Sequence, residues 1–323
     1  MKPPLLRCEN LHVWYAIRKG LFSRLTGHVR AVDGVDLTIE DSEILGLVGE
    51  SGCGKSTLAR AILKLEPITR GVVTFDGRDL ATFSGKRLRR YRRDVQVVFQ
   101  DPFASLNPRH SIRDIVTEGL RVHGLVRERD CDAAAARLLR DVGMDRDALP
   151  RYPHAFSGGQ RQRIAIARAL ALEPRLIVCD EAVSALDVSI RAQILNLMAD
   201  LRKHRKLAYL FITHDISVVQ HLADRIAVMY AGRLMETGSA DAVLDRAAHP
   251  YTRLLLETAP SIGRPLPESA ARDPAATRAP TEGCPFAPRC PLCVERCRVE
   301  QPLLEPVPGR GDDTHAAACF RAG

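Results

Sequence analysis

The stretch GESGCGKST, Gly49 to Thr57, has the residue types and spacing of a loop that binds phosphate groups. It fits the pattern G-x-x-x-x-G-K-[ST], and it lies between the apolar run EILGLVG and the segment KSTLARAILKL, whose apolar residues recur at helical spacing. Glycines let successive backbone N–H groups turn toward the β- and γ-phosphates of a nucleotide, and a helix N-terminus adds positive potential. The stretch therefore predicts a nucleotide site between a strand and a helix.

Within this loop the side chains have separate expected roles. Lys55 brings a positive charge to the phosphates, the Ser56 hydroxyl can ligate Mg²⁺, and Thr57 adds a phosphate contact. Cys53 stands where the pattern accepts any residue, so we interpret it as a filler without a redox role. The expected nucleotide-binding positions are Gly49, Ser51, Gly52, Cys53, Gly54, Lys55, Ser56 and Thr57. The loop alone leaves the task open, because motors, switches and kinases share it.

Two acidic residues close a later apolar strand, LIVCDE, at Asp180 and Glu181. Open α/β sheets bind ligands at the C-terminal edge of their strands, where Asp180 would hold Mg²⁺ through water. Glu181 would then polarise the water that attacks the nucleotide. The alternative, that both residues merely cap the next helix, is weaker in a chain that carries a phosphate-binding loop upstream.

Between these two elements stands FSGGQRQR, in which a serine and two glycines open a helix. A hydroxyl and bare backbone N–H groups at a helix N-terminus form an anion site. Placed after a phosphate-binding loop and before an acidic strand end, this sequence resembles the signature of the ATP-binding cassette (ABC) ATPases. The resemblance implies that the chain works as a dimer, in which ATP held by the opposite subunit is contacted by Ser157, Gly158, Gly159 and Gln160.

The remaining elements of that family follow in order. Gln100 in VVFQDP matches the Q-loop glutamine, SALD matches the D-loop, and His214 in FITHD matches the switch histidine. Tyr15 matches the aromatic position that stacks on adenine, whereas Trp14, of opposite strand parity, is expected to be packed or exposed. The resemblance implies hydrolysis of ATP by in-line attack of water. The implied catalytic residues are Glu181, His214, Gln100 and Lys55, and the implied Mg²⁺ ligands are Ser56, Gln100 and Asp180.

The elements that position these residues follow from hydrophobic periodicity. Residues 5 to 48 alternate as short strands, residues from about 101 to 170 are mostly helical, and beyond them short apolar strands alternate with helices. Together with the resemblance, which covers residues 5 to about 260, this indicates an α/β fold of the ABC P-loop type. It implies a RecA-like core, an antiparallel β-subdomain and a helical subdomain. We expect the cassette at residues 1–260, and a linker and Cys-rich tail at residues 261–323.

The net charge is +8, and the densest basic run is GKRLRRYRRD at residues 85 to 94. We interpret the run as a solvated helix face; a nucleic-acid site would want stacking aromatics, and only Tyr91 is at hand. Apolar runs fall short of the ~20 residues that span a bilayer, and the N-terminus lacks a signal-peptide core. Any membrane association is therefore expected to be peripheral.

Several stretches resemble one branch of the family, the oligopeptide and dipeptide importers: the insert AIRKGLFSRLTGH, VFQDPFASLNPR, HPYTRLLLETAP and GCPFAPRCPLCVERC. The first two are similar to the second of the two ATPase subunits in such importers. The resemblance implies a homologous partner ATPase, two transmembrane permease subunits and an extracytoplasmic peptide-binding protein, with this chain at the cytoplasmic face of the inner membrane. Nickel, glutathione or another small solute is the alternative cargo. A soluble ABC ATPase acting on nucleic acid or ribosomes is the more distant alternative.

Five of the nine cysteines lie in the tail. A cytosolic ATPase keeps its thiols reduced, which argues against disulfides and leaves metal ligands or unliganded packing thiols. The importer tail pattern is matched by Cys284, Cys290, Cys297 and Cys319. Some relatives with this tail hold a [4Fe-4S] cluster, and zinc is the alternative. Cys293 has no counterpart in the pattern and stays outside the ligand set, and His315 is a possible replacement ligand. Cys8, Cys131 and Cys179 are interpreted as ordinary packing or surface thiols.

Overall fold

The computed structural model describes residues 3–19, 24–258, 282–308 and 314–322. The chain divides into two compact units, residues 1–81 with 211–323 and residues 82–210. Strand β8 (Ala208–Thr213) carries the chain from the second unit back into the first. The expected boundary at residue 260 stays a prediction, because the residues around the start of the expected linker, up to residue 281, lie outside those described.

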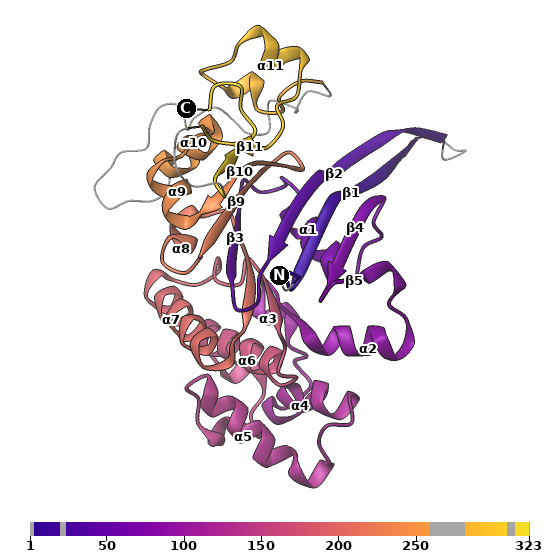
Figure 1. Cartoon of the computed structure of the whole chain (residues 1–323). Coiled ribbons are helices and arrows are strands. Elements are labelled where there is room, and N and C mark those ends of the chain that lie inside the picture. Colours follow the sequence, from indigo (N-terminus) through magenta and orange to yellow (C-terminus); the bar gives the residue numbers. More distant parts are fainter. Residues whose placement is uncertain (1–2, 20–23, 259–281, 309–313, 323) are drawn as a thin grey trace. The chain divides into compact units, whose positions relative to one another are not determined.

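An antiparallel sheet forms the N-terminal part of the first unit, in the order β2-β1-β4-β5 (Figure 1). The first two strands of the structure are longer than the periodicity predicts, because residues of the expected insert pair with one another as well. Ala16 lies opposite His28, and Ile17 lies opposite Gly27. This sheet confirms the antiparallel β-subdomain. Its strands are β1 (Leu6–Lys19), β2 (Arg24–Ile39), β4 (Arg70–Phe75) and β5 (Arg78–Asp79).

A second set of strands in the first unit has the order β11-β12-β10-β9-β3. β3 pairs in parallel with β9, and the other pairs are antiparallel. All five residues of β3 are buried, as its apolar run predicts. The strands are β3 (Ile44–Val48), β9 (Arg225–Tyr230), β10 (Arg233–Ser239), β11 (Glu305–Pro306) and β12 (Ala316–Ala317). The helices of this unit are α1 (Lys55–Ile62), α8 (Ile216–Gln220), α9 (Ala240–Asp245), α10 (Pro250–Thr258) and α11 (Glu295–Val299).

The second unit combines the parallel pair β6 (Val95–Val98) and β7 (Leu176–Asp180) with helices. Helix α6 is central, since α3, α4, α5, α7 and β6 all contact it. Its ring of buried side chains reflects this position. The helices are α2 (Gly85–Asp94), α3 (Pro102–Ser105), α4 (Ile112–Val122), α5 (Cys131–Asp141), α6 (Gly158–Leu170) and α7 (Val188–Arg205).

The basic run forms helix α2, and its aromatic residue is not available to a nucleic acid. Tyr91 is 2% exposed and packs edge to face against Phe83, with 5.7 Å between the ring centroids. The arginines of α2 therefore stand without a stacking platform on their own helix. None of the described helices is both long and apolar enough to cross a membrane.

Candidate active site

The phosphate-binding loop connects β3 to α1 in the first unit, as predicted. Two of its glycines are required by close contacts: a Cβ on Gly49 would lie 2.1 Å from the Met229 carbonyl oxygen, and one on Gly54 would lie 2.0 Å from that of Ala31. Gly54 also has φ +110°, a conformation that L side chains rarely adopt. The loop backbone is therefore pressed against β9 and β2, and no larger residue fits at these two positions.

Lys55 is the first residue of α1, and its ammonium group lies within the loop. Its Nζ donates to the carbonyl oxygens of Gly49 at 2.6 Å and Glu50 at 2.9 Å, and the residue is 3% exposed. A buried ammonium group needs such acceptors, which a phosphate would supply more strongly. Burial raises the pKa of the Cys53 thiol although Lys55 lowers it, so this thiol stays protonated. Ser56 and Thr57 follow in the first turn of α1.

The acidic pair lies at the end of β7 in the second unit, next to Gln100, the predicted Q-loop glutamine. Gln100 Nε2 donates to Glu181 Oε2 at 2.9 Å. Since a carboxylate only accepts, this contact assigns the amide nitrogen to Glu181 and leaves the amide oxygen of Gln100 for another partner. Glu181 has φ +48°, in the left-handed region that non-glycine residues seldom adopt. Asp180, the last residue of β7, is half-buried.

The Ser-Gly-Gly-Gln stretch begins helix α6 with a capping box. Ser157 Oγ accepts from the Gln160 N–H at 3.4 Å, and Gln160 Oε1 accepts from the Ser157 N–H at 3.0 Å. A Cβ on Gly159 would lie 2.5 Å from Ile190 Cγ2, so glycine is required where α6 meets α7. The helix N-terminus with its bare glycine backbone thus has the form expected of an anion site.

The predicted D-loop, Ser184 to Asp187, and the predicted switch histidine, His214, lie in loops that precede helices α7 and α8. Ser184 Oγ and N–H both donate to the Glu181 carbonyl oxygen, at 2.9 and 3.1 Å, and Asp187 caps α7 through the Ile190 N–H. His214 is exposed in the turn between β8 and α8. The structure thus brings Gln100 together with Glu181 in the second unit, and it describes the phosphate-binding loop and His214 in the first.

A cavity of about 660 Å³ in the first unit adjoins the phosphate-binding loop; its lining includes Trp14, Arg30, Gly52 and Cys53. Trp14 is held by several partners: its Nε1 donates to Asp33 at 3.1 Å, and Arg30 and Arg70 lie over its ring at 5.0 and 5.3 Å. Tyr15 is 38% exposed and is not among the described residues that line this cavity. Trp14 is therefore packed, as expected, and the role of Tyr15 stays a prediction.

A Tyr15→Ala variant is expected to bind ATP about tenfold more weakly, because it loses the aromatic ring that stacks on adenine. Tyr15→Phe keeps the ring and should bind as the wild type does. Calorimetric titration with Mg²⁺-ATP measures both. Loss of affinity in Trp14→Ala but not in Tyr15→Ala would move adenine stacking to Trp14.

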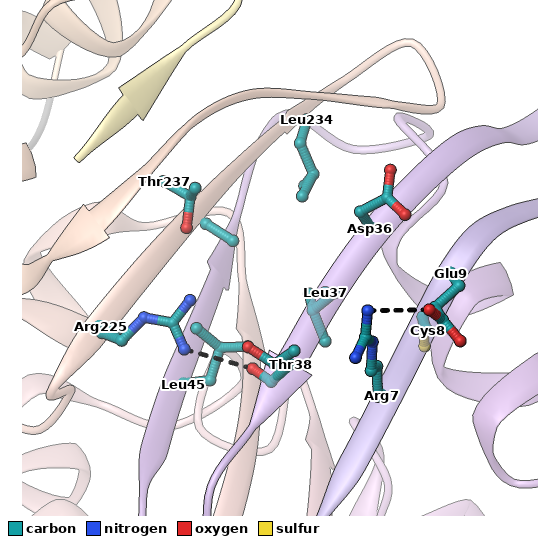
Figure 2. Close-up of a pocket in the computed structure, with 11 residues that line it drawn as sticks. Arg7, Cys8, Glu9, Asp36, Leu37, Thr38, Leu45, Arg225, Leu234 and Thr237 are labelled. Atoms are coloured by element: carbon teal, nitrogen blue, oxygen red, sulfur yellow. Dashed lines mark hydrogen bonds and ion pairs between the residues drawn. The ribbon is translucent and has the colours of Figure 1, made fainter. Parts of the chain in front are cut away.

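A second, smaller cavity of about 200 Å³ in the first unit is lined by other residues (Figure 2). Arg7 and Glu9 form an ion pair at 2.8 Å on one side of it, and Arg225 donates to the Thr38 carbonyl oxygen at 3.3 Å on the other. Burial, reinforced by Asp36, raises the pKa of the Cys8 thiol to about 12. Arg7 and Arg225 at this cavity are thus already paired, and the Cys8 thiol stays protonated, consistent with Cys8 as a packing residue.

Within the first unit, the tail residues pack on β10 through a buried hydrogen bond. Glu236 and His315 are both fully buried, and His315 Nε2 lies 2.7 Å from Glu236 Oε1. The same carboxylate accepts from the N–H groups of Ala248 and His249, both at 2.8 Å. His315 thus directs Nε2 to a carboxylate, and β12 beside it pairs with β10.

The four predicted tail thiols are Cys284, Cys290, Cys297 and Cys319, and the structure describes all of them. Cys284 N–H donates to the Cys297 carbonyl oxygen at 2.8 Å, which places two of them on neighbouring backbone segments. Within the described ranges, however, no group of three or more His, Cys, Asp or Glu residues is placed to hold a metal ion. The expected metal centre therefore has no direct structural support.

Comparison with known proteins finds relatives that match almost the whole chain. Residues 32–184 match the family model described as ABC transporter, and residues 235–297 match that described as oligopeptide/dipeptide transporter, C-terminal region. A protein of Sinorhizobium fredii named "Probable peptide ABC transporter ATP-binding protein y4tS" is 47% identical over 99% of this chain and 90% of its own length. The oligopeptide transport ATP-binding protein AppF of Bacillus subtilis is 44% identical over 98% of this chain and 96% of its own.

Two further proteins are similar to this chain over a smaller part of its length. The glutathione import ATP-binding protein GsiA of Escherichia coli is 51% identical over 80% of this chain, which spans 41% of that longer protein. Among solved structures, cbiO1 of Clostridium perfringens, part of the ABC transporter complex cbiONQ, superposes with a TM-score of 0.65. It is 25% identical, over 75% of this chain and 91% of that one.

Proposed function

Because this chain belongs to the family of ABC transporter ATP-binding proteins, we propose that it hydrolyses ATP to drive the import of peptides through separate membrane permease subunits. The observation that carries the peptide cargo is the similarity to peptide transport ATPases over almost the whole length, together with the oligopeptide/dipeptide C-terminal region. The fold is the α/β fold of ABC ATPases with an antiparallel β-subdomain.

The proposed reaction uses the residues in the roles that their chemistry allows. Lys55 binds the phosphates, and Glu181 takes a proton from a water that attacks the γ-phosphorus. The bond from that phosphorus to the β–γ bridging oxygen breaks, which releases ADP and phosphate. Gln100 holds the Glu181 carboxylate through its amide nitrogen, and His214 helps to orient the water.

Magnesium fits the donor types of this proposed site. Mg²⁺ prefers oxygen ligands, which the Ser56 hydroxyl, the Asp180 carboxylate and the amide oxygen of Gln100 offer. The last of these is available because the amide nitrogen of Gln100 is bound to Glu181. When bound, the ion would neutralise charge on the phosphate oxygens.

The proposed assembly is a dimer of homologous ATPases beneath two permease subunits, served by an extracytoplasmic peptide-binding protein. The capping box supports this, because it presents Ser157, Gly158 and Gly159 as an anion site at the start of α6, suited to ATP on the opposite subunit. In this assembly the chain lies at the cytoplasmic face of the inner membrane. Glutathione is the second candidate cargo, favoured by the 51% identity to GsiA.

Purification with the permease subunits and reconstitution in lipid vesicles test the proposal. With the cognate binding protein present, ATP hydrolysis should rise on addition of dipeptides or oligopeptides and stay at its basal rate with nickel. Stimulation by glutathione alone would replace the peptide assignment, and failure to co-purify with membrane subunits would count against a transporter role.

For the tail we propose that Cys284, Cys290, Cys297 and Cys319 hold a [4Fe-4S] cluster, with Zn²⁺ as the alternative. Burial raises the pKa of the Cys284 thiol to about 11, and the proximity of the other three thiols adds to the rise. Thiols that disfavour one another's ionisation gain from a cation that compensates their charge.

Wild-type protein purified without oxygen should contain about four iron atoms per chain and absorb visible light. Cys290→Ser should lose most of both, because serine is a poor ligand for the soft cluster. Cys293→Ser is the matched control and should keep the iron. Iron and acid-labile sulfide analysis measures the outcome, and colourless protein with one zinc per chain would assign zinc instead.

A further inference from the structure

Two C-terminal segments contact one residue of the phosphate-binding loop, to which the sequence motifs assign no role. The segments are helix α10 and the Cys-rich segment around Cys284 and Cys290. Glu50 occupies a position where the loop pattern accepts any residue. Arg289, which lies between Cys284 and Cys290, donates to both of its carboxylate oxygens, from Nη1 to Oε2 and from Nη2 to Oε1, each at 2.8 Å. This fork-to-fork geometry is the strongest form of the arginine–carboxylate contact.

The ion pair is shielded from water by aromatic rings. Arg289 lies over the rings of Phe286 and Tyr230, at 5.6 and 5.7 Å from their centroids. The Arg289 side chain is only 11% exposed, and that of Glu50 26%. Because the surroundings are partly desolvated, the attraction is less screened than in a surface ion pair, whose net contribution is small.

The backbone of Glu50 is held as well. Its N–H donates to Tyr251 Oη at 2.9 Å, and its carbonyl oxygen accepts from Lys55 Nζ at 2.9 Å. Tyr251 belongs to α10 and is buried against Tyr230 and Phe286, with ring centroids 4.7 and 5.3 Å apart. Helix α10 and the Cys-rich segment therefore fix the same loop residue, one through its backbone and one through its side chain.

We propose that Arg289 is a positioning residue for ATP binding, which holds the phosphate-binding loop in its nucleotide-ready form through Glu50. A loop already ordered before the nucleotide arrives loses less entropy on binding, so the ion pair raises affinity without touching ATP. The inference rests on the proposed ATPase function. The inference also assigns a structural role to the Cys-rich segment, because its backbone forms the turn that carries Arg289. In this turn the Ala287 N–H donates to the Cys284 carbonyl oxygen and the Arg289 N–H donates to the Phe286 carbonyl oxygen, both at 3.0 Å.

The test is calorimetric titration of the full chain with Mg²⁺-ATP. Arg289→Ala should weaken binding about tenfold, and KM for ATP should rise by a similar factor while kcat at saturating ATP changes less than about twofold. Arg289→Lys keeps the charge but not the fork, so its loss should be intermediate. The matched control is Arg296→Ala, which also removes a tail arginine that is paired with a glutamate, Glu300, and stacked on a ring, Phe320, but neither of these partners belongs to the phosphate-binding loop.

A double-mutant cycle separates positioning from general damage to the fold. If Arg289 acts through Glu50, then Glu50→Gln with Arg289→Ala should bind ATP no more weakly than Arg289→Ala alone. Equal ATP affinity in Arg289→Ala and Arg296→Ala, or strictly additive losses in the cycle, would overturn the inference. Should Arg289→Ala fail to fold, Glu50→Gln alone must show the weakened binding. A wild-type chain that binds no ATP would instead refute the proposed function.

Discussion

A Glu181→Gln variant is expected to bind ATP as tightly as the wild type and to hydrolyse it at least ~100-fold more slowly. Glutamine keeps the size of the side chain and its position at the end of β7 but cannot take a proton from water. It also turns the contact with Gln100 Nε2, 2.9 Å away in the structure, from carboxylate–amide into amide–amide. Phosphate release at saturating ATP measures the rate, and calorimetry measures the binding.

A second glutamate with a similar backbone conformation, Glu173, is the matched control for this prediction. Glu181 has φ +48° and Glu173 has φ +52°, and both belong to the second unit, but Glu173 is an exposed residue before β7. The turn at Glu181 is held by Ser184, whose N–H and hydroxyl both donate to the Glu181 carbonyl oxygen. Glu173→Gln should therefore hydrolyse ATP normally. Near-normal turnover in Glu181→Gln, with a partner ATPase known to be inactive, would remove Glu181 as the base.

The Lys55→Ala variant should lose roughly 100-fold in ATP affinity, because hydrogen bonds between a charged group and the phosphates are the strongest in the loop. The ammonium group is buried and already directed at the loop carbonyls of Gly49 and Glu50, so removing it also frees two acceptors. Hydrolysis at any practical ATP concentration should fall with the affinity. Titration with Mg²⁺-ATP measures the loss.

Lys64 is the matched control for Lys55, because it lies just beyond the other end of α1 and also donates to a backbone carbonyl, that of Leu80, at 2.8 Å. Lys64→Ala should bind ATP like the wild type. Equal losses in both variants would mean that the positive charge of the region, and not the loop lysine, determines affinity. A wild-type affinity in Lys55→Ala would contradict its place in the site.

Much of the fold was predictable because its signals are local. The run EILGLVG predicts a buried strand and becomes β3, in which every residue is buried. The Ser-Gly-Gly-Gln stretch predicts the start of a helix and forms a capping box, since Ser157 and Gln160 are only three residues apart. The insert was harder to predict. Its residues pair across two strands, between positions 5 to 12 residues apart, and alternation along one strand does not reveal such pairing, so β1 and β2 extend further than alternation indicates.

By itself, the sequence determined the loop chemistry, the order of the motifs and hence the family, because each motif is a short run whose function depends on neighbouring residues. Only the tertiary structure placed Arg289 on Glu50, 239 positions apart, and Glu236 on His315, 79 positions apart. It also showed that two arginines lie over the ring of Trp14. Such contacts join residues that are far apart in the chain and are brought together only by folding, so no periodic pattern in the sequence indicates them. The tail cysteines, for which the family resemblance implied a metal site, thus flank an arginine whose partner lies in the phosphate-binding loop.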